Sequence, residues 1–259
     1  MPFLIRRVSQ ATPSTLQWLV DAGLISEVIR EIKSGKESRI YLVLRRRGES
    51  YMYLAAKVHI PRDRRSFRRE ATYRTEWFIK ERTSRKAVEK MTRYGRKFVG
   101  SRWVDQEFQT LKRLWKKGAH VPTPILKHGD TIIMTYLGDP NEPAPKLNEV
   151  DLRGEALEDA FNQVLHNLEI FINEDVVHGD LSPYNMLYWE DKVWIIDLPQ
   201  AVDLHRNPNS MDLLYRDLNN ICRFFNRGEL SCSADTLFQR LIGVPHVPGR
   251  TYQELLMHE

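Results

Sequence analysis

The stretch 176-VVHGDLSPYNMLYWEDKVWIIDLP-199 decides how this chain is interpreted. It places Asp180 and Asn185 five residues apart in a polar turn, and it ends an apolar run with Asp197 twelve residues after Asn185. Packing does not explain three acceptor side chains at this spacing, because buried carboxylates are costly unless they are paired or bound to a cation. The spacing is suited to binding a divalent metal and a phosphate.

Two short apolar runs within this stretch, 186–189 and 193–196, predict a β-hairpin because a polar turn separates them. The turn that carries Asp180 and Asn185 enters the hairpin, and Asp197 leaves it. All three side chains are therefore expected at the same edge of a small two-stranded sheet.

Composition is that of a globular protein with a sizeable core, since the chain has 259 residues and is 42% hydrophobic. No apolar run approaches the roughly 18 residues that span a bilayer, and the first residues lack the apolar core of a secretory signal. We therefore expect a cytoplasmic protein without a membrane partner. Cys222 and Cys232 lack metal-site spacing, so we expect reduced thiols rather than a disulfide.

Charge is distributed unevenly along the chain. Residues 61–102 contain 15 Lys and Arg against 5 Asp and Glu, although the whole chain has a net charge of only +5. Such a run is commonly a solvated helical face, and it can also be a docking surface for RNA or a ribosomal particle. The sequence leaves both interpretations open.

Periodicity and turn signals outline the remaining elements. The chain changes from β-rich to helix-rich near 138–145, which is the candidate boundary between two lobes. The predicted elements are strands at 39–45 and 51–58, a helix at 103–118, two strands within 121–138 and a helix at 152–175.

Phosphoryl transfer needs metal ligands, a lysine on the phosphates and a carboxylate near the nucleophile, and the chain has a candidate for each. Asp180 is placed to orient or deprotonate the acceptor. The oxygen atoms of Asn185 and Asp197 suit Mg²⁺. Lys57 lies in an apolar strand and needs a counter-charge, for which Glu107 on the following helix is the natural partner.

Taken singly, several of these residues have ordinary structural explanations. A strand lysine such as Lys57 is usually exposed, a helix glutamate such as Glu107 is usually solvated, and Gly35 alone indicates only a turn. His178 alone is more often structural than catalytic. The joint pattern H-G-D-x4-N followed by apolar-apolar-Asp is much harder to obtain by chance.

Segments from about Glu31 to Phe225 form a more specific combined pattern. They are 34-SGKESRIYL-42, 55-AAKV-58, 93-RYGRK-97, 104-VDQEFQTLKRL-114, 121-VPTPI-125, 133-IMTYLG-138, 143-PAPKLNEV-150, 178-HGDLSPYNMLY-188, 195-IIDLPQAV-202 and 212-DLLYRDLNNICRFF-225. With this pattern the chain resembles the RIO family of atypical protein kinases, closest to its RIO1-like branch and its bacterial members.

The resemblance implies an α+β, bilobal protein-kinase-like fold without the activation loop and peptide-binding subdomains of ordinary protein kinases. It also implies binding of ATP and Mg²⁺ and phosphorylation of serine or threonine in a protein substrate or in the chain itself, with an ATPase switch as a variant of this activity. The implied division is a capping segment at 1–30, an N-lobe at 31–138 with a basic insertion at 61–102, and a C-lobe at 139–259.

The resemblance also assigns roles by position. Asp180 is the implied catalytic carboxylate, and Asn185 and Asp197 are the implied metal ligands. In some family members the last Asp is itself phosphorylated, so Asp197 is also a candidate acceptor. The nucleotide contacts implied are Gly35 and Ser38 on the phosphates, Lys57 paired with Glu107 at the ATP phosphates, and the Thr135 carbonyl and Leu137 amide on the adenine.

Three residues depart from the family pattern and leave the choice of substrate open. Gly179 replaces the usual alanine and is similar to small-molecule kinases such as aminoglycoside phosphotransferases. Pro183 replaces an acidic residue, and Pro199 removes a hydroxyl and a backbone donor after Asp197. Two alternatives to a protein kinase therefore stay open: a small-molecule phosphotransferase, and a nucleotide-gated assembly factor that binds RNA or ribosomes. The sequence does not indicate an oligomeric state.

Overall fold

The computed structural model describes residues 12–60, 93–227 and 230–257, except for the side chains of 93–101. Among the helices of these ranges, none has the length and apolar character that crossing a bilayer requires. The chain divides into two compact units. The described part of unit 1 comprises 12–60, 93–108 and 122–143, and that of unit 2 comprises 109–121, 144–227 and 230–257.

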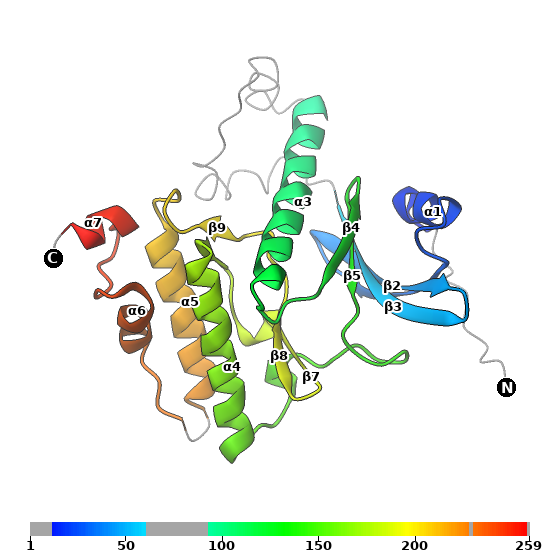
Figure 1. The fold of residues 1–259 in the computed structure, drawn as a ribbon. Helices are drawn as coiled ribbons and strands as arrows, with labels where there is room; N and C mark the ends of the chain where they lie inside the picture. Colours follow the sequence, from blue (N-terminus) through cyan, green and yellow to red (C-terminus); the bar gives the residue numbers. More distant parts are fainter. Residues whose placement is uncertain (1–11, 61–92, 228–229, 258–259) are drawn as a thin grey trace. The chain divides into compact units, whose positions relative to one another are not determined.

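Unit 1 is built on a five-stranded antiparallel sheet with the strand order β1-β2-β3-β5-β4 (Figure 1). Both hairpins predicted from turn signals are confirmed, and their turns contain Gly48 and Gly129 at φ 59° and 56°. Glycine adopts this left-handed conformation without the strain that a Cβ causes. The strands are β1 (Glu27–Ser34), β2 (Ser38–Arg47), β3 (Ser50–His59), β4 (Pro124–His128) and β5 (Thr131–Thr135).

Strand β1 was not among the predicted elements, and its irregular pairing explains why. Its register against β2 shifts between Val28 and Arg30 and again between Glu31 and Lys33. Each shift disturbs the alternation of side chains between the two faces of the sheet. The sequence of β1 therefore lacks the period of two by which strands are recognised.

Helix α1 (Ser14–Asp21) packs against one face of this sheet. The strand neighbours of Lys57, which are Ala56 and Val58, belong to the same apolar cluster as this helix. Because successive strand residues point to opposite faces, Lys57 lies on the face away from α1. The cluster under α1 contains Leu16, Leu19, Ile25, Tyr41, Val43, Leu54, Ala56, Val58 and Ile133.

Helix α3 (Arg93–Lys116) begins ten residues before the helix predicted at 103–118. It ends at the predicted Lys-Lys-Gly signal, where Gly118 has φ 87°.

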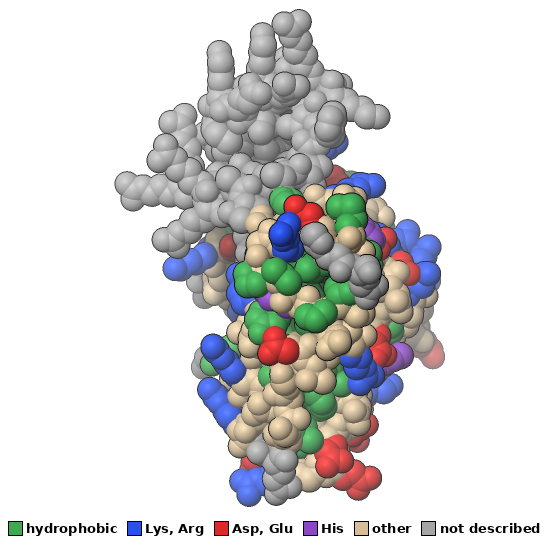
Figure 2. Space-filling view, turned by 90° about the vertical axis from the view of Figure 1, so that its left-hand side faces the viewer, with side chains coloured by type: hydrophobic (Ala, Val, Ile, Leu, Met, Phe, Trp, Pro, Cys, Tyr) green, Lys and Arg blue, Asp and Glu red, His purple; other side chains and the backbone are tan. Residues whose placement is uncertain are grey.

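Most of the basic segment 61–102 lies outside the described residues, so its role in binding RNA stays a prediction. On the face drawn in Figure 2, the described charged side chains of both signs are scattered, with hydrophobic side chains between them.

Unit 2 contains two long helices that lie side by side, α4 (Gly154–Asn173) and α5 (Ser210–Phe225) (Figure 1). The rings of Phe161 and Phe225 meet between them with centroids 5.0 Å apart. Helix α4 confirms the helix predicted at 152–175. The shorter elements are β6 (Val176–Val177), β7 (Met186–Trp189), β8 (Lys192–Ile195), β9 (Val202–Asp203), α6 (Ala234–Ile242) and α7 (Tyr252–Leu256).

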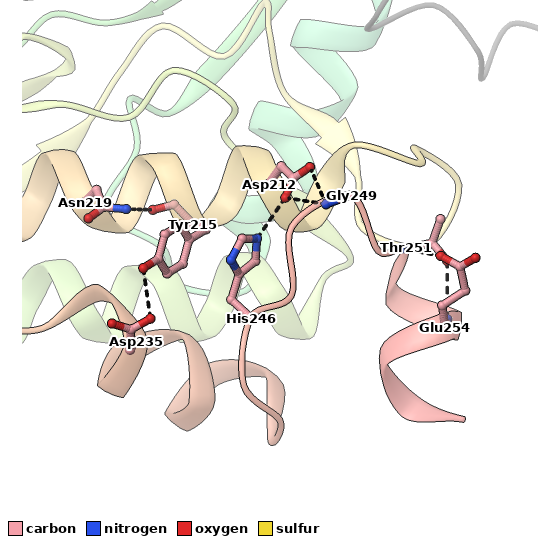
Figure 3. A network of polar contacts seen from close by, with 8 residues as sticks. All are labelled: Asp212, Tyr215, Asn219, Asp235, His246, Gly249, Thr251 and Glu254. Carbon is pink, nitrogen blue, oxygen red and sulfur yellow. Dashed lines mark hydrogen bonds and ion pairs between the residues drawn. The ribbon is translucent and has the colours of Figure 1, made fainter. Parts of the chain in front are cut away.

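Helix α5 also holds the segment between α6 and α7 (Figure 3). The Asp212 carboxylate accepts hydrogen bonds from the Gly249 amide at 3.1 Å and from His246 Nε2 at 2.8 Å. The Tyr215 ring stacks on His246 with centroids 4.0 Å apart, and its hydroxyl donates to Asp235 at 2.9 Å. These contacts stabilise the end of the chain on a face of α5.

The expectation of reduced thiols is wrong, because Cys222 and Cys232 form a disulfide. Cys222 lies in the last turns of α5, and Asn226 follows that helix. The Asn226 amide donates to the Cys232 carbonyl at 2.8 Å and accepts from the Cys232 amide at 2.7 Å. These hydrogen bonds hold Cys232 next to the end of α5. The Cα atoms of the two cysteines lie 5.2 Å apart, within the range that a disulfide spans.

Candidate active site

Lys57 and Glu107 form a buried ion pair in unit 1, as the sequence predicted. Lys57 comes from β3 and Glu107 from α3, both residues are 5% exposed, and Nζ lies 2.5 Å from Oε1. Opposite charges in contact offset part of the cost of removing each from water. The pair therefore holds an ammonium group at a fixed position on the face of the sheet away from α1.

His59 is a third member of this cluster, and sequence reasoning missed it. Its Nε2 lies 2.6 Å from Glu107 Oε2, and its Nδ1 lies 3.0 Å from the Asp130 carbonyl oxygen. His59 follows Lys57 by two residues on the same strand, so both side chains point to the same face. The position of His59 two residues after Lys57 was the signal in the sequence that could have identified it.

The predicted phosphate loop is the short connection between β1 and β2. The Gly35 amide donates to the Ser38 carbonyl at 2.9 Å, and a Cβ at position 35 would lie only 3.1 Å from that oxygen. Ser38 is directly opposite His59 in the sheet, and Ile40 is directly opposite Lys57. The structure thus brings Gly35 and Ser38 to the end of the sheet that carries Lys57.

The predicted adenine contacts lie where β5 ends. The Thr135 amide donates to the Thr123 carbonyl at 3.0 Å, and the Thr135 hydroxyl accepts from the Thr123 amide at 2.8 Å. Leu137 follows with a buried side chain. The contacts of the Thr135 carbonyl and the Leu137 amide to adenine stay predictions.

Asp180 and Asn185 are in contact in unit 2. The Asn185 side-chain amide donates to the Asp180 carbonyl at 2.8 Å and lies 3.3 Å from Asp180 Oδ2. The turn between them contains a short 3₁₀ helix, η3 (Pro183–Asn185), in which Pro183 occupies an early position that suits its fixed φ. Hydrogen bonds between Asp180 and Asn185 therefore close the polar turn that the sequence predicted.

Asp197 follows β8 at the edge of the predicted hairpin, where Asn185 precedes β7. The two strands pair antiparallel, and the Ile196 amide donates to the Asn185 carbonyl at 3.0 Å. Asp197 is exposed and has φ 68°, a left-handed conformation that is uncommon outside glycine. Asp180 is exposed as well, so both carboxylates are open to solvent.

Asp217 of α5 fixes the turn that contains Asp180, and sequence reasoning missed it. Its Oδ2 accepts from the Gly179 amide at 2.8 Å and its Oδ1 from the Leu181 amide at 2.9 Å. Arg216 donates to the Gly179 carbonyl from the same helix. Burial raises the pKa of the Asp217 carboxyl to about 7, although the hydrogen bonds from Leu181 and Gly179 lower it.

The signal for Asp217 was its place in the apolar stripe of α5. Its helix neighbours Leu213, Leu214, Leu218 and Ile221 are buried, and Asp217 is 1% exposed among them. An acidic residue in such a stripe is costly unless it accepts hydrogen bonds.

His178 is buried and has the structural role that the sequence favoured. Its Nε2 lies 3.1 Å from the Ile196 carbonyl oxygen, and its Nδ1 lies 3.3 Å from the Asp180 amide. Because the carbonyl only accepts and the amide only donates, the ring carries its proton on Nε2. His178 thus links the turn before β7 to the end of the hairpin.

The donor set in unit 2 fits a hard divalent cation. Within the described ranges, no group of three or more His, Cys, Asp or Glu is arranged around a common centre. The candidate ligands stay the amide oxygen of Asn185, which contacts Asp180, and the carboxylate of Asp197. Oxygen ligands of this kind are those that Mg²⁺ prefers, with waters and phosphate oxygens completing the shell.

Comparison with known families identifies the fold to which these residues belong. A family model described as the RIO domain matches residues 39–237, which include Lys57, Glu107, Asp180, Asn185 and Asp197. The chain belongs to the RIO family.

Curated RIO proteins from three distantly related organisms are similar to it. It is 40% identical to the serine/threonine-protein kinase RIO3 of Mus musculus over 49% of this chain and 24% of that one. It is 33% identical to rio1 of Schizosaccharomyces pombe over 83% and 41%, and 34% identical to Rio1 of Haloferax volcanii over 54% and 48%. The chain thus spans less than half the length of these relatives.

Two solved structures of the Rio2 kinase from Chaetomium thermophilum share the fold. One matches with a TM-score of 0.62 and 19% identity over 95% of this chain and 71% of that one. The other is an ADP/Mg²⁺-phosphoaspartate complex, with a TM-score of 0.58 and 20% identity over 93% and 64%. The RIO chain therefore has the predicted α+β, protein-kinase-like fold, with a β-rich unit and a helical unit.

Only residues 198–209 separate Asp197 from α5 in this RIO chain, and they contain the short strand β9. This connection is too short for the long activation loop of ordinary protein kinases. The short connection thus agrees with the abbreviated kinase fold that the sequence predicted.

Proposed function

We propose that this chain is a RIO-type serine/threonine kinase that transfers the γ-phosphoryl group of ATP to a protein serine or threonine or to itself. The observation that carries the proposal is the buried Lys57–Glu107 pair. A protein retains such a pair at a cost in desolvation, and a lysine fixed on a sheet face is the group that kinases use on nucleotide phosphates. The names of the relatives, which are serine/threonine-protein kinases, support this assignment.

The proposed reaction divides the work between five residues. Lys57 binds the non-transferred phosphates, and Glu107 orients it. Asn185 and Asp197 hold Mg²⁺, which neutralises charge on the phosphates when bound. Asp180 orients the acceptor hydroxyl and takes its proton.

In the proposed transfer, one bond to the γ-phosphorus breaks and another forms. The bond from the γ-phosphorus to the oxygen that bridges to the β-phosphorus breaks, and that oxygen keeps the electron pair as ADP forms. A bond forms from the γ-phosphorus to the acceptor oxygen, whose proton passes to Asp180. In the same proposal, Gly35 and Ser38 contact the phosphates. Thr135 and Leu137 contact the adenine.

Asp197 is a second candidate acceptor. Rio2 of Chaetomium thermophilum was solved with phosphoaspartate, ADP and Mg²⁺, which supports a similar intermediate here. A carboxylate acceptor has no proton to lose at neutral pH, so transfer to Asp197 would not need Asp180 as a base. Hydrolysis of the acyl phosphate would then release phosphate, which is the ATPase form of the proposal.

A small-molecule phosphotransferase is less well supported, because Gly179 has a conformational explanation. Its φ is 76°, and its amide and carbonyl both bond to α5. An alanine in this conformation would be strained, so the glycine fits the backbone of this turn and need not reflect a substrate.

The test is incubation of the full chain with Mg²⁺ and γ-labelled ATP, with label on protein and released phosphate measured separately. The variants are Asp180→Ala and Asp197→Asn, and the matched control is Asp191→Asn in the turn between β7 and β8. If the acceptor is a hydroxyl group, we expect both variants to lose label while the control keeps it. If the acceptor is Asp197, Asp197→Asn should lose the label and Asp180→Ala should keep it. Label stable to acid indicates phosphoserine, and label released by hydroxylamine indicates phosphoaspartate. An unlabelled wild type that releases no phosphate, although it binds ATP, would refute the proposal.

A further inference from the structure

The Glu107 carboxylate contacts two side chains from the same strand, one at each oxygen. Lys57 Nζ lies 2.5 Å from Oε1, and His59 Nε2 lies 2.6 Å from Oε2. The three side chains are 6%, 5% and 15% exposed for Lys57, Glu107 and His59. Both carboxylate oxygens are thus held, and each is held by a different residue.

The hydrogen bonds of His59 define where its protons lie. Nδ1 faces the Asp130 carbonyl oxygen, which can only accept, so Nδ1 carries a proton. Nε2 lies 2.6 Å from Glu107 Oε2, a distance at which the ring and the carboxyl group are hydrogen-bonded. His59 therefore acts as a hydrogen-bonded bridge from the turn between β4 and β5 to α3.

The imidazole is itself held firmly. The Asp130 carbonyl accepts both from the His59 backbone amide at 2.9 Å and from the ring at 3.0 Å. Glutamate by contrast has several rotatable bonds, and Oε1 alone would let the carboxylate turn about the Lys57 contact. A second, rigid contact at Oε2 removes that freedom.

We propose that His59 is a positioning residue that orients Glu107 and, through it, Lys57 toward the nucleotide phosphates. This inference rests on the proposed function, in which Lys57 binds those phosphates. His59 lies on the same sheet face as Lys57, and Ser38 lies directly opposite it. The sheet thus supports the loop, the lysine and its positioning residue from one surface.

A matched pair of variants separates this role from simple packing. In His59→Gln, the side-chain nitrogen can reach the position of Nε2 and donate to Glu107. In His59→Asn, the shorter amide reaches the position of Nδ1 and keeps only the contact to Asp130. Both variants are neutral amides, so they differ mainly in which hydrogen bond survives. His59→Met retains neither bond.

The measurement is calorimetric titration of the full chain with ADP and Mg²⁺, and separately with adenosine, which has no phosphate. A hydrogen bond to a charged group contributes enough for about a tenfold change in affinity. We expect His59→Gln to bind ADP about tenfold more tightly than His59→Asn or His59→Met. All three should bind adenosine within about twofold of one another, because Lys57 does not contact the nucleoside.

Two further variants distinguish failure of this inference from failure of the proposed function. Lys57→Met should lose ADP affinity, and Lys112→Met, an exposed lysine on α3, should not. If Lys57→Met weakens ADP binding while the Gln and Asn variants bind alike, the role of His59 is wrong and the proposed function stands. If Lys57→Met binds ADP like the wild type, the role of Lys57 in the proposed function is wrong. Parallel loss of ADP and adenosine affinity in His59→Asn would indicate a structural role and overturn the inference.

Discussion

The pairing of Lys57 and Glu107 predicts strong energetic coupling between them. In Glu107→Gln, the buried ammonium loses a carboxylate oxygen that lies 2.5 Å away, and in Lys57→Met the buried carboxylate loses its cation. Removal of one partner from a buried pair costs about 3–5 kcal/mol. Because about 1 kcal/mol shifts the melting temperature of a domain of this size by roughly 2–4 °C, each variant should melt at a temperature roughly 10 °C lower.

The double variant Lys57→Met/Glu107→Gln should lose less stability than the sum of the single variants, because it leaves neither charge without the other. We expect a coupling energy of about 2 kcal/mol in the cycle, measured by urea denaturation followed by circular dichroism. The control is Lys127→Met, which removes a more exposed pair to Asp105 at 2.6 Å in the same unit and should cost less than about 1 kcal/mol. Losses that add to within about 0.5 kcal/mol would refute the argument that Lys57 and Glu107 stabilise each other.

Two further predictions concern unit 2. Because the pKa of Asp217 is raised from 3.8 to about 7, the folded chain keeps a proton that the unfolded chain releases, and this contribution to stability is lost as pH rises through that range. The stability of the wild type minus that of Asp217→Asn should therefore be roughly 2–3 kcal/mol larger at pH 5 than at pH 8 in urea denaturation, and an equal difference would contradict the raised pKa. The disulfide joins residues ten apart, so Cys232→Ser should reduce stability by about 2–3 kcal/mol. Dithiothreitol should lower the melting temperature of the wild type and leave that of Cys232→Ser unchanged, and an unchanged melting temperature of the wild type would show that Cys222 and Cys232 are not bridged.

Local signals predicted the elements that local physics determines. The hairpins β2–β3 and β4–β5 have glycine turns between apolar runs, and β7–β8 has a polar turn between two such runs, so each could be recognised within about 20 residues. Helix α4 has a long apolar stripe and was predicted within two residues at each end. Strand β1 was missed because its bulges break the alternation that identifies a strand.

Contacts between distant segments were harder to predict. The ion pair of Lys57 and Glu107 was predicted because a lysine in an apolar strand needs a counter-charge. His59 was missed because a histidine beside that lysine has no such obvious need, and its contact depends on how α3 packs 48 residues later. The disulfide was missed because it depends on the hydrogen bonds of Asn226, which the spacing of the cysteines does not reveal.

The two hydrogen bonds that Asp217 accepts from the turn around Asp180 also affect when this turn can form during synthesis of the chain. The Gly179 and Leu181 amides find their acceptors 38 and 36 residues further along the chain. A ribosome adds residues from the N-terminus at about 5–20 per second. The turn with Asp180 therefore leaves the ribosome seconds before Asp217, the residue that accepts its hydrogen bonds. Until α5 emerges, those amides can bond only to water or to a temporary partner. A nascent chain stopped before Ser210 could form the whole sheet of unit 1 and still lack the hydrogen bonds that complete the turn around Asp180.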